Sequence, residues 1–228
     1  MKASTNTTKK YIAASKLIEK EFYTVEEATE LLTKVSTVKF DATAEIHIRI
    51  NADTTQADQL VRTIVSLPHG TGKKVRIAAF VEDDQVEAAK KAGADLAGKE
   101  ELIKEVESGK LDFDIAIASP TVMKDLGKIA KTLGQKGLMP NPKAGTVTKD
   151  IKGTIAELKK GRIECKMDKQ AIIHTIFGKV SFGGKKLAEN LETLLTAVKE
   201  AQPVGIKGIY IKSITIAPSM GPGIKIHP

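Results

Sequence analysis

The chain has 228 residues, a net charge of +8 and a hydrophobic content of 41%, which is adequate for packed cores and argues against global disorder. A single cysteine, Cys165, excludes an internal disulfide, and no apolar run approaches the ~20 residues that span a bilayer. The N-terminus lacks the apolar core of a signal peptide, so we expect a cytoplasmic protein, and the basic excess suggests an anionic partner.

The first part of the chain predicts helices followed by a half-buried strand. Apolar residues recur at helical spacing over residues 8–34, and Thr24 with Glu27 forms a plausible capping box. From Ala42 the period changes to two, which predicts a strand with one apolar and one polar face. The apolar positions are Ala44, Ile46, Ile48 and Ile50, and the polar positions are Thr43, Glu45, His47 and Arg49. Residues 59–67 suggest a further strand.

The middle of the chain follows a different pattern. Continuous apolar runs at 75–81 and 115–119 are typical of strands covered on both faces. Helices are expected over 84–92, 99–108, 120–133 and 151–159. Because strands alternate with helices, this region predicts a small parallel sheet with crossover helices.

Alternation returns after Gly161. We expect a strand over 171–177, an amphipathic helix over 185–201 and a last strand over 208–217. The prediction is therefore an α+β outer domain formed by both termini, residues 1–69 and 160–228, with an inserted α/β domain at 70–159 and two strands crossing between them. Residues 160–228 hold 11 Lys and Arg against 5 Asp and Glu, so the basic charge gathers in the C-terminal half of the outer domain.

Enzyme motifs are missing from the sequence. GTGKK at 70–74 lacks the first glycine and the following Ser or Thr of a phosphate loop, and no dinucleotide-binding glycine pattern follows a strand. The four histidines have no metal-ligand spacing. The acid pairs Asp83–Asp84 and Asp112–Asp114 are expected to begin a helix and to flank a buried strand. We therefore expect no catalytic residue, no metal and no cofactor.

The stretch LGQKGLMPNPKAGTVT, residues 133–148, predicts a rigid, shaped loop. Pro140 and Pro142 fix φ, and the neighbouring glycines permit turns. Lys136 and Lys143 add positive charge to it, and a purely structural role, such as docking against the outer domain, is equally compatible with the sequence.

Four segments together resemble the ribosomal protein L one family, which builds the mobile stalk of the large ribosomal subunit. They are GKLDFDIAIASPTVMKDLGKIAKTLGQKGLMPNPKAGTV (109–147), KFDATAEIHIRI (39–50), VRTIVSLPHGTGK (61–73) and IKGIYIKSITIAPSMGPGIKI (206–226). The resemblance runs from about Tyr11 to the end of the chain. It implies that the insert is a Rossmann-like α/β three-layer domain, with hinges at PHGTGK and near Lys160–Arg162.

The resemblance also implies RNA-binding residues, nearly all on the outer domain, with Lys136 and Lys143 of the insert as a candidate secondary RNA contact. The residues that match the family's RNA-facing segments are Phe40, Thr43, Glu45, Lys166, Asp168, Lys169, His174, Lys179, Ser213, Ser219, Met220, Gly221 and Pro222. Lysines would position phosphates, and small hydroxyls would reach 2′-OH groups. By itself, Phe40 would more often be a core residue, and the resemblance makes the two roles about even. His174 is equally a structural histidine, and Met220 could plug the end of the sheet.

Two departures from the family pattern concern the interface. The usual Thr-Met-Gly-Pro turn is Ser-Met-Gly-Pro here, and the segment 51–59 lacks a basic pair that many relatives carry. Cys165 stands where an aromatic residue is frequent.

The leading hypothesis is a noncatalytic protein, monomeric when free, that binds large-subunit rRNA as part of the large ribosomal subunit. The family role adds contact with exit-site tRNA and repression of the protein's own mRNA. The alternatives are a nucleotide- or substrate-binding enzyme centred on the α/β insert, and a nonspecific basic nucleic-acid binder outside the ribosome.

Overall fold

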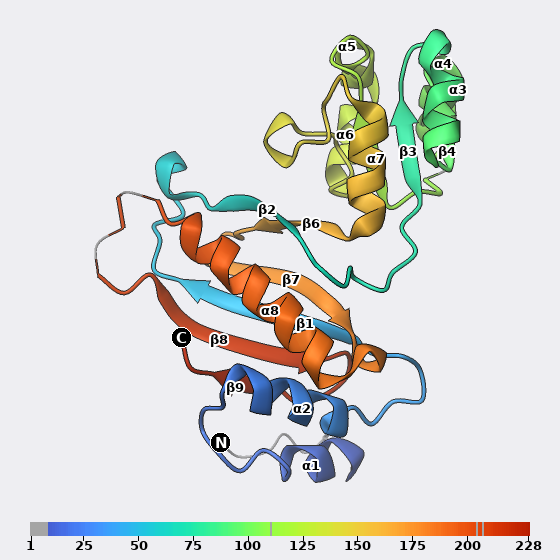
Figure 1. Ribbon diagram of the computed structural model, residues 1–228. Coiled ribbons are helices and arrows are strands. Elements are labelled where there is room, and N and C mark those ends of the chain that lie inside the picture. The colour runs from blue at the N-terminus through green and yellow to red at the C-terminus, as the bar shows by residue number, and fades with distance from the viewer. Residues whose placement is uncertain (1–8, 110, 204, 207) are drawn as a thin grey trace. The chain divides into compact units, whose positions relative to one another are not determined.

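Strand β1 (Thr43–Ile50) is central to a four-stranded antiparallel sheet that joins the two ends of the chain. The strand order is β7 (Ile172–Lys179), β1, β8 (Ile211–Pro218), β9 (Ile224–Ile226). The buried residues of β1 are Ala44, Ile46, Ile48 and Ile50, as the alternation predicts. Figure 1 shows β1 in blue between the orange and red strands. The expectation that both termini build one sheet is confirmed.

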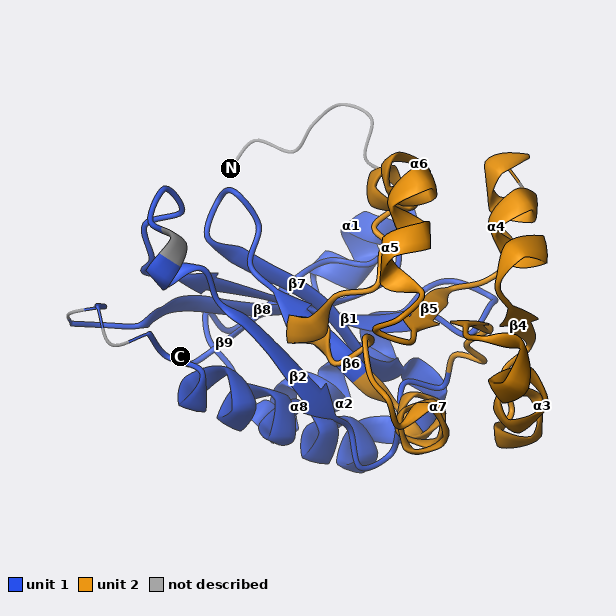
Figure 2. Ribbon diagram, turned by 90° about the horizontal axis from the view of Figure 1, so that it is seen from above, with its two compact units in different colours: residues 1–72, 163–228 blue, residues 73–162 orange. Residues whose placement is uncertain are grey.

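The computed structural model describes residues 9–109, 111–203, 205, 206 and 208–228. The chain divides into unit 1, residues Met1–Gly72 with Ile163–Pro228, and unit 2, residues Lys73–Arg162 (Figure 2). No helix among the described residues is long and apolar enough to cross a membrane.

Two helices cover one face of the unit 1 sheet. Helix α2 (Val25–Val35) starts with the expected capping box of Thr24 and Glu27, and helix α8 (Gly183–Glu200) buries Leu187, Leu191 and Leu194. Figure 2 shows both helices on the same side of the strands. Their apolar stripes pack on the buried positions of β1, β7 and β8 to form one core. Unit 1 also holds α1 (Lys9–Ser15), η1 (Ala57–Gln59) and η4 (Val180–Phe182).

A two-stranded sheet pairs β2 (Arg62–Ser66) with β6 (Arg162–Lys166). Asn190 of α8 is buried beside the segment that follows β2. Its side chain donates to the carbonyl oxygens of Gly70 (3.0 Å) and Phe177 (2.8 Å) and accepts from the amide of His69 (3.0 Å). The first part of the expected hinge PHGTGK is thus bound to α8 and β7 within unit 1.

Unit 2 contains a three-stranded parallel sheet in the order β4 (Leu96–Gly98), β3 (Ile77–Phe80), β5 (Ile115–Ala118). All four residues of β3 are buried, as its continuous apolar run predicts. Side chains of α4 (Glu100–Glu107), α5 (Met123–Leu126) and α6 (Ala130–Gln135) pack on one face of the sheet. Those of α3 (Asp83–Ala92) and α7 (Ile151–Lys160) pack on the other. The parallel sheet in the middle of the chain is confirmed.

Several predicted elements have different bounds. The helical region 8–34 contains the two helices α1 and α2, as the capping box predicts, and between them Tyr23 pairs with the β9 edge through the carbonyl oxygen of Lys225 (3.1 Å). The expected helix over 120–133 is broken between α5 and α6 by η2 (Gly127–Ile129), where glycine disfavours the α-helix. The expected strand over 59–67 is confined to β2.

Two short strands were missed. Strand β4 follows the left-handed glycine cap of α3, and the side chain of Asp95 accepts from the amide of Ile77 (2.9 Å). Strand β9 follows β8, so the predicted last strand is in fact the penultimate one. Each has three residues, too few for a periodic pattern to stand out.

Candidate nucleic-acid interface

The face of the unit 1 sheet opposite α2 and α8 is polar. We call it the open face. Its side chains come from alternate strand positions, and the register places His174, His47, Thr215 and Lys225 in one row across all four strands. Arg49 lies in the next row, opposite Ser213 of β8. The predicted polar side of β1 therefore forms part of a larger surface.

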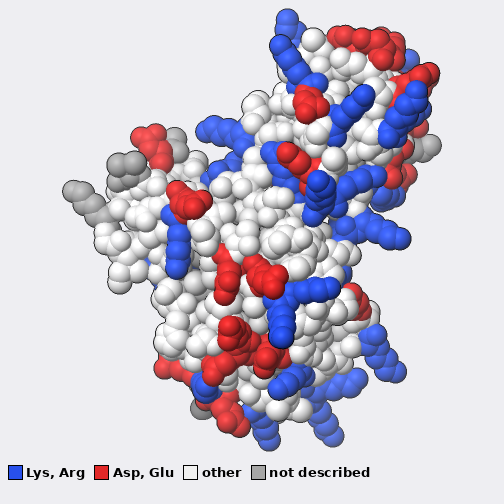
Figure 3. Space-filling view, in the orientation of Figure 1, with Lys and Arg blue, Asp and Glu red and all other residues white. Residues whose placement is uncertain are grey.

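Charge differs between the two sides of unit 1. Helices α2 and α8 carry six glutamates against four lysines, and Figure 3 shows acidic side chains over them. The open face and its margins carry the cations Arg49, Lys169, Lys179, Lys212 and Lys225, with Glu45, Asp53 and Asp168 as acids. The open face is thus the side suited to an anionic partner.

The two ends of the chain meet at the Thr43–Ser219 corner, which consists of Thr43, Glu45, Lys179 and Ser219. The Ser219 amide donates to the Thr43 carbonyl oxygen (3.0 Å), and the Thr43 amide donates to Ser219 Oγ (3.3 Å). Lys179 Nζ donates to Thr43 Oγ1 (2.8 Å). The Ser219 hydroxyl lies 3.3 Å from Glu45 Oε1, so this carboxylate orients the hydroxyl as well as adding charge.

The turn after Ser219 presents an unusual backbone. Met220 has a φ of +64°, which is uncommon for a residue with a side chain, and its side chain is 80% exposed. The Gly221 amide donates to the Pro218 carbonyl oxygen (2.9 Å) and closes the turn. A Cβ at Gly221 would lie 2.4 Å from Cγ of Pro218, so the turn requires glycine there. Pro222 follows directly.

Phe40 precedes β1 and is 57% exposed, so it is not a core residue. Neither does Met220 plug the sheet end. Both side chains offer exposed apolar surface close to the corner in sequence. Phe40 precedes Thr43 by three residues, and Met220 directly follows Ser219.

Asp41 supports the same region and was not singled out from the sequence. Its carboxylate accepts from the Ser181 amide (3.1 Å) and the Ser181 hydroxyl (2.8 Å), and its carbonyl oxygen accepts from Lys179 Nζ (3.3 Å). These bonds hold the entry to β1 against the end of β7. A single aspartate between Phe40 and a strand gives no periodic signal, so only the tertiary contact reveals it.

His47 and His174 face each other across β1 and β7. Their Nδ1 atoms are 2.8 Å apart, so one ring donates a proton and the other accepts it. Burial lowers the pKa of His47, and the charge of His174 lowers it further. Among the described residues, no group of three or more His, Cys, Asp or Glu side chains could hold a metal ion.

The predicted residues near 166–174 do not share one strand. Lys166 ends β6, Asp168 and Lys169 lie in the turn that follows, and His174 is on β7. Asp168 Oδ1 accepts from the amides of Gln170 and Ile172, both at 2.8 Å. These bonds lower the pKa of Asp168, and His174 Nε2 lies 3.5 Å from its carboxylate. Asp168 thus shapes the turn that presents Lys169.

A basic hollow lies at the Arg49 end of the open face. It has a volume of about 260 Å³, and its lining includes Arg49, Lys169 and Lys212. Asp53 also lines it, but this carboxylate accepts from the amide and hydroxyl of Thr55 (2.9 and 2.7 Å). Arg49 was recognised as a polar position of its strand, whereas Lys212 was not singled out, although it too interrupts an apolar strand.

The stretch 133–148 belongs to unit 2. Its first residues complete α6, Asn141 caps the short helix η3 (Pro142–Ala144), and Gly145 adopts a left-handed φ of +63°. Val147 then pairs with Ala118 and extends the sheet beyond β5. Within unit 2 the stretch therefore forms a capped turn and extends the sheet, and Lys136 and Lys143 are exposed side chains on it.

Cys165 is fully buried in unit 1. Burial raises the pKa of its thiol to about 11. The thiol is therefore protonated near neutral pH and acts as a small apolar group of the core.

The open face is thus a polar surface that presents hydroxyls and cations on neighbouring strands. Comparison with known proteins identifies its class. The ribosomal protein L1p/L10e family matches residues 32–222, and the chain belongs to this family. It is 46% identical over 222 residues to the large ribosomal subunit protein uL1 of Thermosipho melanesiensis (strain DSM 12029 / CIP 104789 / BI429), with 96% of each chain covered. The expected family is confirmed.

Membership makes the chain a noncatalytic ribosomal protein. The alternative of a nucleotide- or substrate-binding enzyme centred on the α/β insert is therefore wrong.

Proposed function

We propose that the chain is a structural constituent of the large ribosomal subunit and binds large-subunit rRNA through the open face of unit 1. One observation carries the proposal: the two ends of the chain converge at the Thr43–Ser219 corner on the polar face that α2 and α8 do not cover. The name of the 46% identical relative places that protein in the large subunit, which supports the same assembly here.

The chemistry of the open face suits a folded RNA. A-form helices hide their base edges in a deep major groove and display 2′-hydroxyls and phosphates. The oriented Ser219 hydroxyl offers a hydrogen bond to a 2′-OH, and Ser213 adds a second hydroxyl on β8. The exposed Met220 and Phe40 supply apolar surface for an unstacked base or a sugar.

The cations would position the RNA. Lys179 lies at the corner, whereas Arg49, Lys169 and Lys212 lie around the hollow at the other end of β1. Cations at both ends of the strand can contact phosphates at both ends of a bound segment and so fix its register. Lys166, Asp168, His174, Gly221 and Pro222 belong to the proposed contact set with the corner residues.

We also propose that unit 1 is the RNA-binding outer domain and that unit 2 is the inserted, Rossmann-like α/β three-layer domain. The parallel sheet with apolar helix contacts on both faces supports the second assignment. Because Asn190 binds His69 and Gly70, a hinge in the first connection would begin after Gly72.

The family role extends the proposal to contact with exit-site tRNA and to repression of the protein's own mRNA. We propose that the chain is monomeric when free and functions in a cytoplasmic ribosome. Lys136 and Lys143 are proposed as a secondary RNA contact. A messenger that folds into a structure like the rRNA site would bind the same open face.

The test measures binding of the purified chain to a stalk rRNA fragment and to a scrambled hairpin at matched salt. We expect the fragment to bind at least about tenfold more tightly, a difference of about 1.4 kcal/mol. Equal affinities would show a nonspecific basic binder and defeat the proposal.

Two variants locate the site. Gly221→Val forces a side chain against Pro218 and should weaken fragment binding by at least about tenfold. Lys143→Gln removes an exposed charge in unit 2 and should cost much less. Thermal unfolding of both variants shows whether the fold is retained. If both bind as the parent does, the open face is not the rRNA site.

A further inference from the structure

Charge is unevenly distributed across the parallel sheet of unit 2. Residues 119–150, which precede α7, hold 6 Lys and Arg against 2 Asp and Glu, whereas residues 73–118 hold 8 against 11. The basic half includes α5, η2, α6, η3 and the 146–148 segment that extends the β5 edge. The acidic half includes α3, β4 and α4. Unit 2 thus has a basic side at the β5 edge and an acidic side at the β4 edge.

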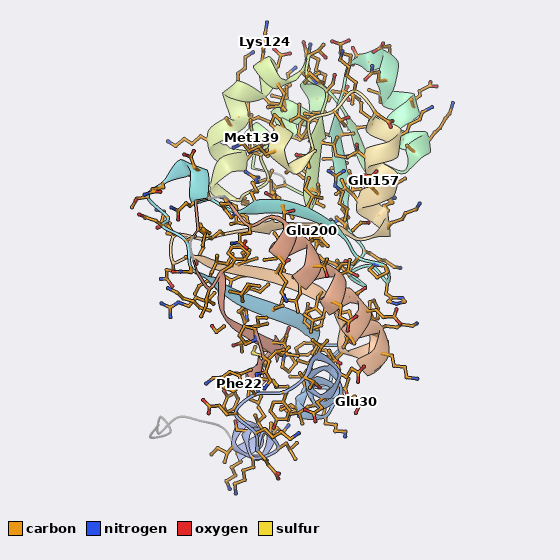
Figure 4. All side chains as sticks on the ribbon, turned by 60° about the vertical axis from the view of Figure 1, so that its left-hand side comes forward. Phe22, Glu30, Lys124, Met139, Glu157 and Glu200 are labelled. Atoms are coloured by element: carbon orange, nitrogen blue, oxygen red, sulfur yellow. The ribbon has the colours of Figure 1, made fainter. Side chains whose placement is uncertain are left out.

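Three lysines form a row on the basic side. Lys124, Lys128 and Lys131 lie on α5, η2 and α6, and all are exposed. The buried positions of the same helical run are Val122, Leu126, Ile129 and Leu133. The lysine row is offset from this stripe by two residues, which is about 200° around a helix. The row therefore points away from the core, and Figure 4 shows Lys124 extending outward.

The nearest acid along the chain does not pair with the row. Asp125 is the single acid of the helical run, and Lys99 of the other half lies 3.1 Å from its carboxylate. In the part of the chain that the structure describes, no row lysine takes part in an ion pair. By contrast, Lys73 and Arg162 of the same unit are paired with Asp114 and Glu157. The positive charges of the lysine row are therefore available to an external anionic partner.

The surface fits a polyanion better than an apolar protein interface. Protein interfaces need buried aromatic or aliphatic anchors. Among the described residues, every exposed large hydrophobic side chain lies in unit 1, from Tyr11 to Met220. The row spans eight residues, from Lys124 to Lys131, which is roughly 10–14 Å of helix. A nucleic-acid strand carries a phosphate about every 3.4 Å along its axis, so the row can face several phosphates of one strand.

We infer that the lysine row of unit 2, Lys124, Lys128 and Lys131, docks on the phosphate backbone of an RNA helix and forms a second binding surface, separate from the open face. Lysine ammonium groups act as point charges, so the contact is independent of base sequence. The inference rests on the proposed function only in taking RNA as the class of partner. It concerns a different surface and a different unit.

The experiment uses the full chain saturated with the stalk rRNA fragment and titrates a fluorescent RNA duplex of about 20 base pairs and unrelated sequence across a salt series. The test variant is Lys124→Gln/Lys128→Gln/Lys131→Gln. The matched control, Lys90→Gln/Lys91→Gln/Lys104→Gln, removes the same charge from the acidic half. We expect the row variant to bind the duplex at least about tenfold more weakly, and its slope of log affinity against log salt to fall by roughly two to three units. The control should change little.

Three other outcomes would overturn the inference. Equal losses in the two variants would mean that net charge alone attracts the duplex. Displacement of the duplex by the stalk fragment would mean a single shared site. Binding of poly-glutamate as tight as duplex binding would point to an acidic protein partner instead. If the open face is not the rRNA site, the stalk fragment will bind no more tightly than a scrambled hairpin. The duplex titration can then still be read on the free chain.

Discussion

The two units cover their sheets differently, and the difference determines where each unit can bind a partner. Unit 1 covers one face of its antiparallel sheet with α2 and α8 and leaves the other face polar. Unit 2 packs apolar helix residues on both faces of its parallel sheet, so its surface consists of helix backs, edges and loops. A half-covered sheet can present side chains on rigid strands, whereas a fully covered sheet must use its outer elements.

Substitution by asparagine along the strands gives the largest expected effects and tests this comparison directly. In β1, Ile48→Asn should lower the free energy of unfolding by roughly 3–5 kcal/mol, whereas His47→Asn should change it by less than about 1 kcal/mol. In β3, Ala78→Asn and Ala79→Asn should both be strongly destabilising, because both positions are fully buried. Urea unfolding measures all four. Equal losses at His47 and Ile48 would contradict an open face.

Substitution of Asn190, whose side-chain amide is buried, gives the next largest expected effect on the free energy of unfolding. Asn190→Leu keeps the volume but leaves the carbonyl oxygens of Gly70 and Phe177 and the amide of His69 without this partner. We expect a loss of roughly 3 kcal/mol and faster hydrogen exchange at the His69 amide. Thr193→Ala on the same helix is the control, because its exposed hydroxyl only donates to the Glu189 carbonyl oxygen. An unchanged urea midpoint would show that Asn190 does not anchor this segment.

The histidine pair gives the smallest effect and sharpens the description of the open face. The pKa of His47 is lowered in the folded chain, so folding opposes its protonation. The unfolded-state pKa is about 6.5. Stability is therefore full above about pH 6.5 and falls as the pH drops toward the lower folded-state pKa.

NMR titration of both imidazoles measures this shift. His174→Asn removes the neighbouring charge and should raise the pKa of His47 toward its ordinary value, without restoring it, because burial is the larger cause. A parent His47 that titrates at or above 6.5 would contradict the 2.8 Å contact.

Much of the fold and part of the candidate site could be predicted from sequence. The alternating isoleucines of β1 and the continuous apolar run of β3 identified their strands and buried faces, because side-chain period is a local property of an extended chain. The family motifs pointed to residues such as Ser219 and Thr43. The short strands β4 and β9 were not predicted, because they form only where the edge of a neighbouring strand is available for pairing. The break between α5 and α6 was not predicted either.

The sequence by itself determined the family, the periodicity of the main strands and helices, and the excess of positive charge. Only the tertiary structure decided that Ser219 bonds Thr43, that Asp41 holds Lys179, and that Arg49, Lys169 and Lys212 surround one hollow. It also decided that the lysines of α5, η2 and α6 face away from the core. The first three are arrangements of residues that lie far apart in the chain. The last concerns which side of one helical run faces the core. Their geometry follows from strand register and packing, which no local pattern of residues encodes.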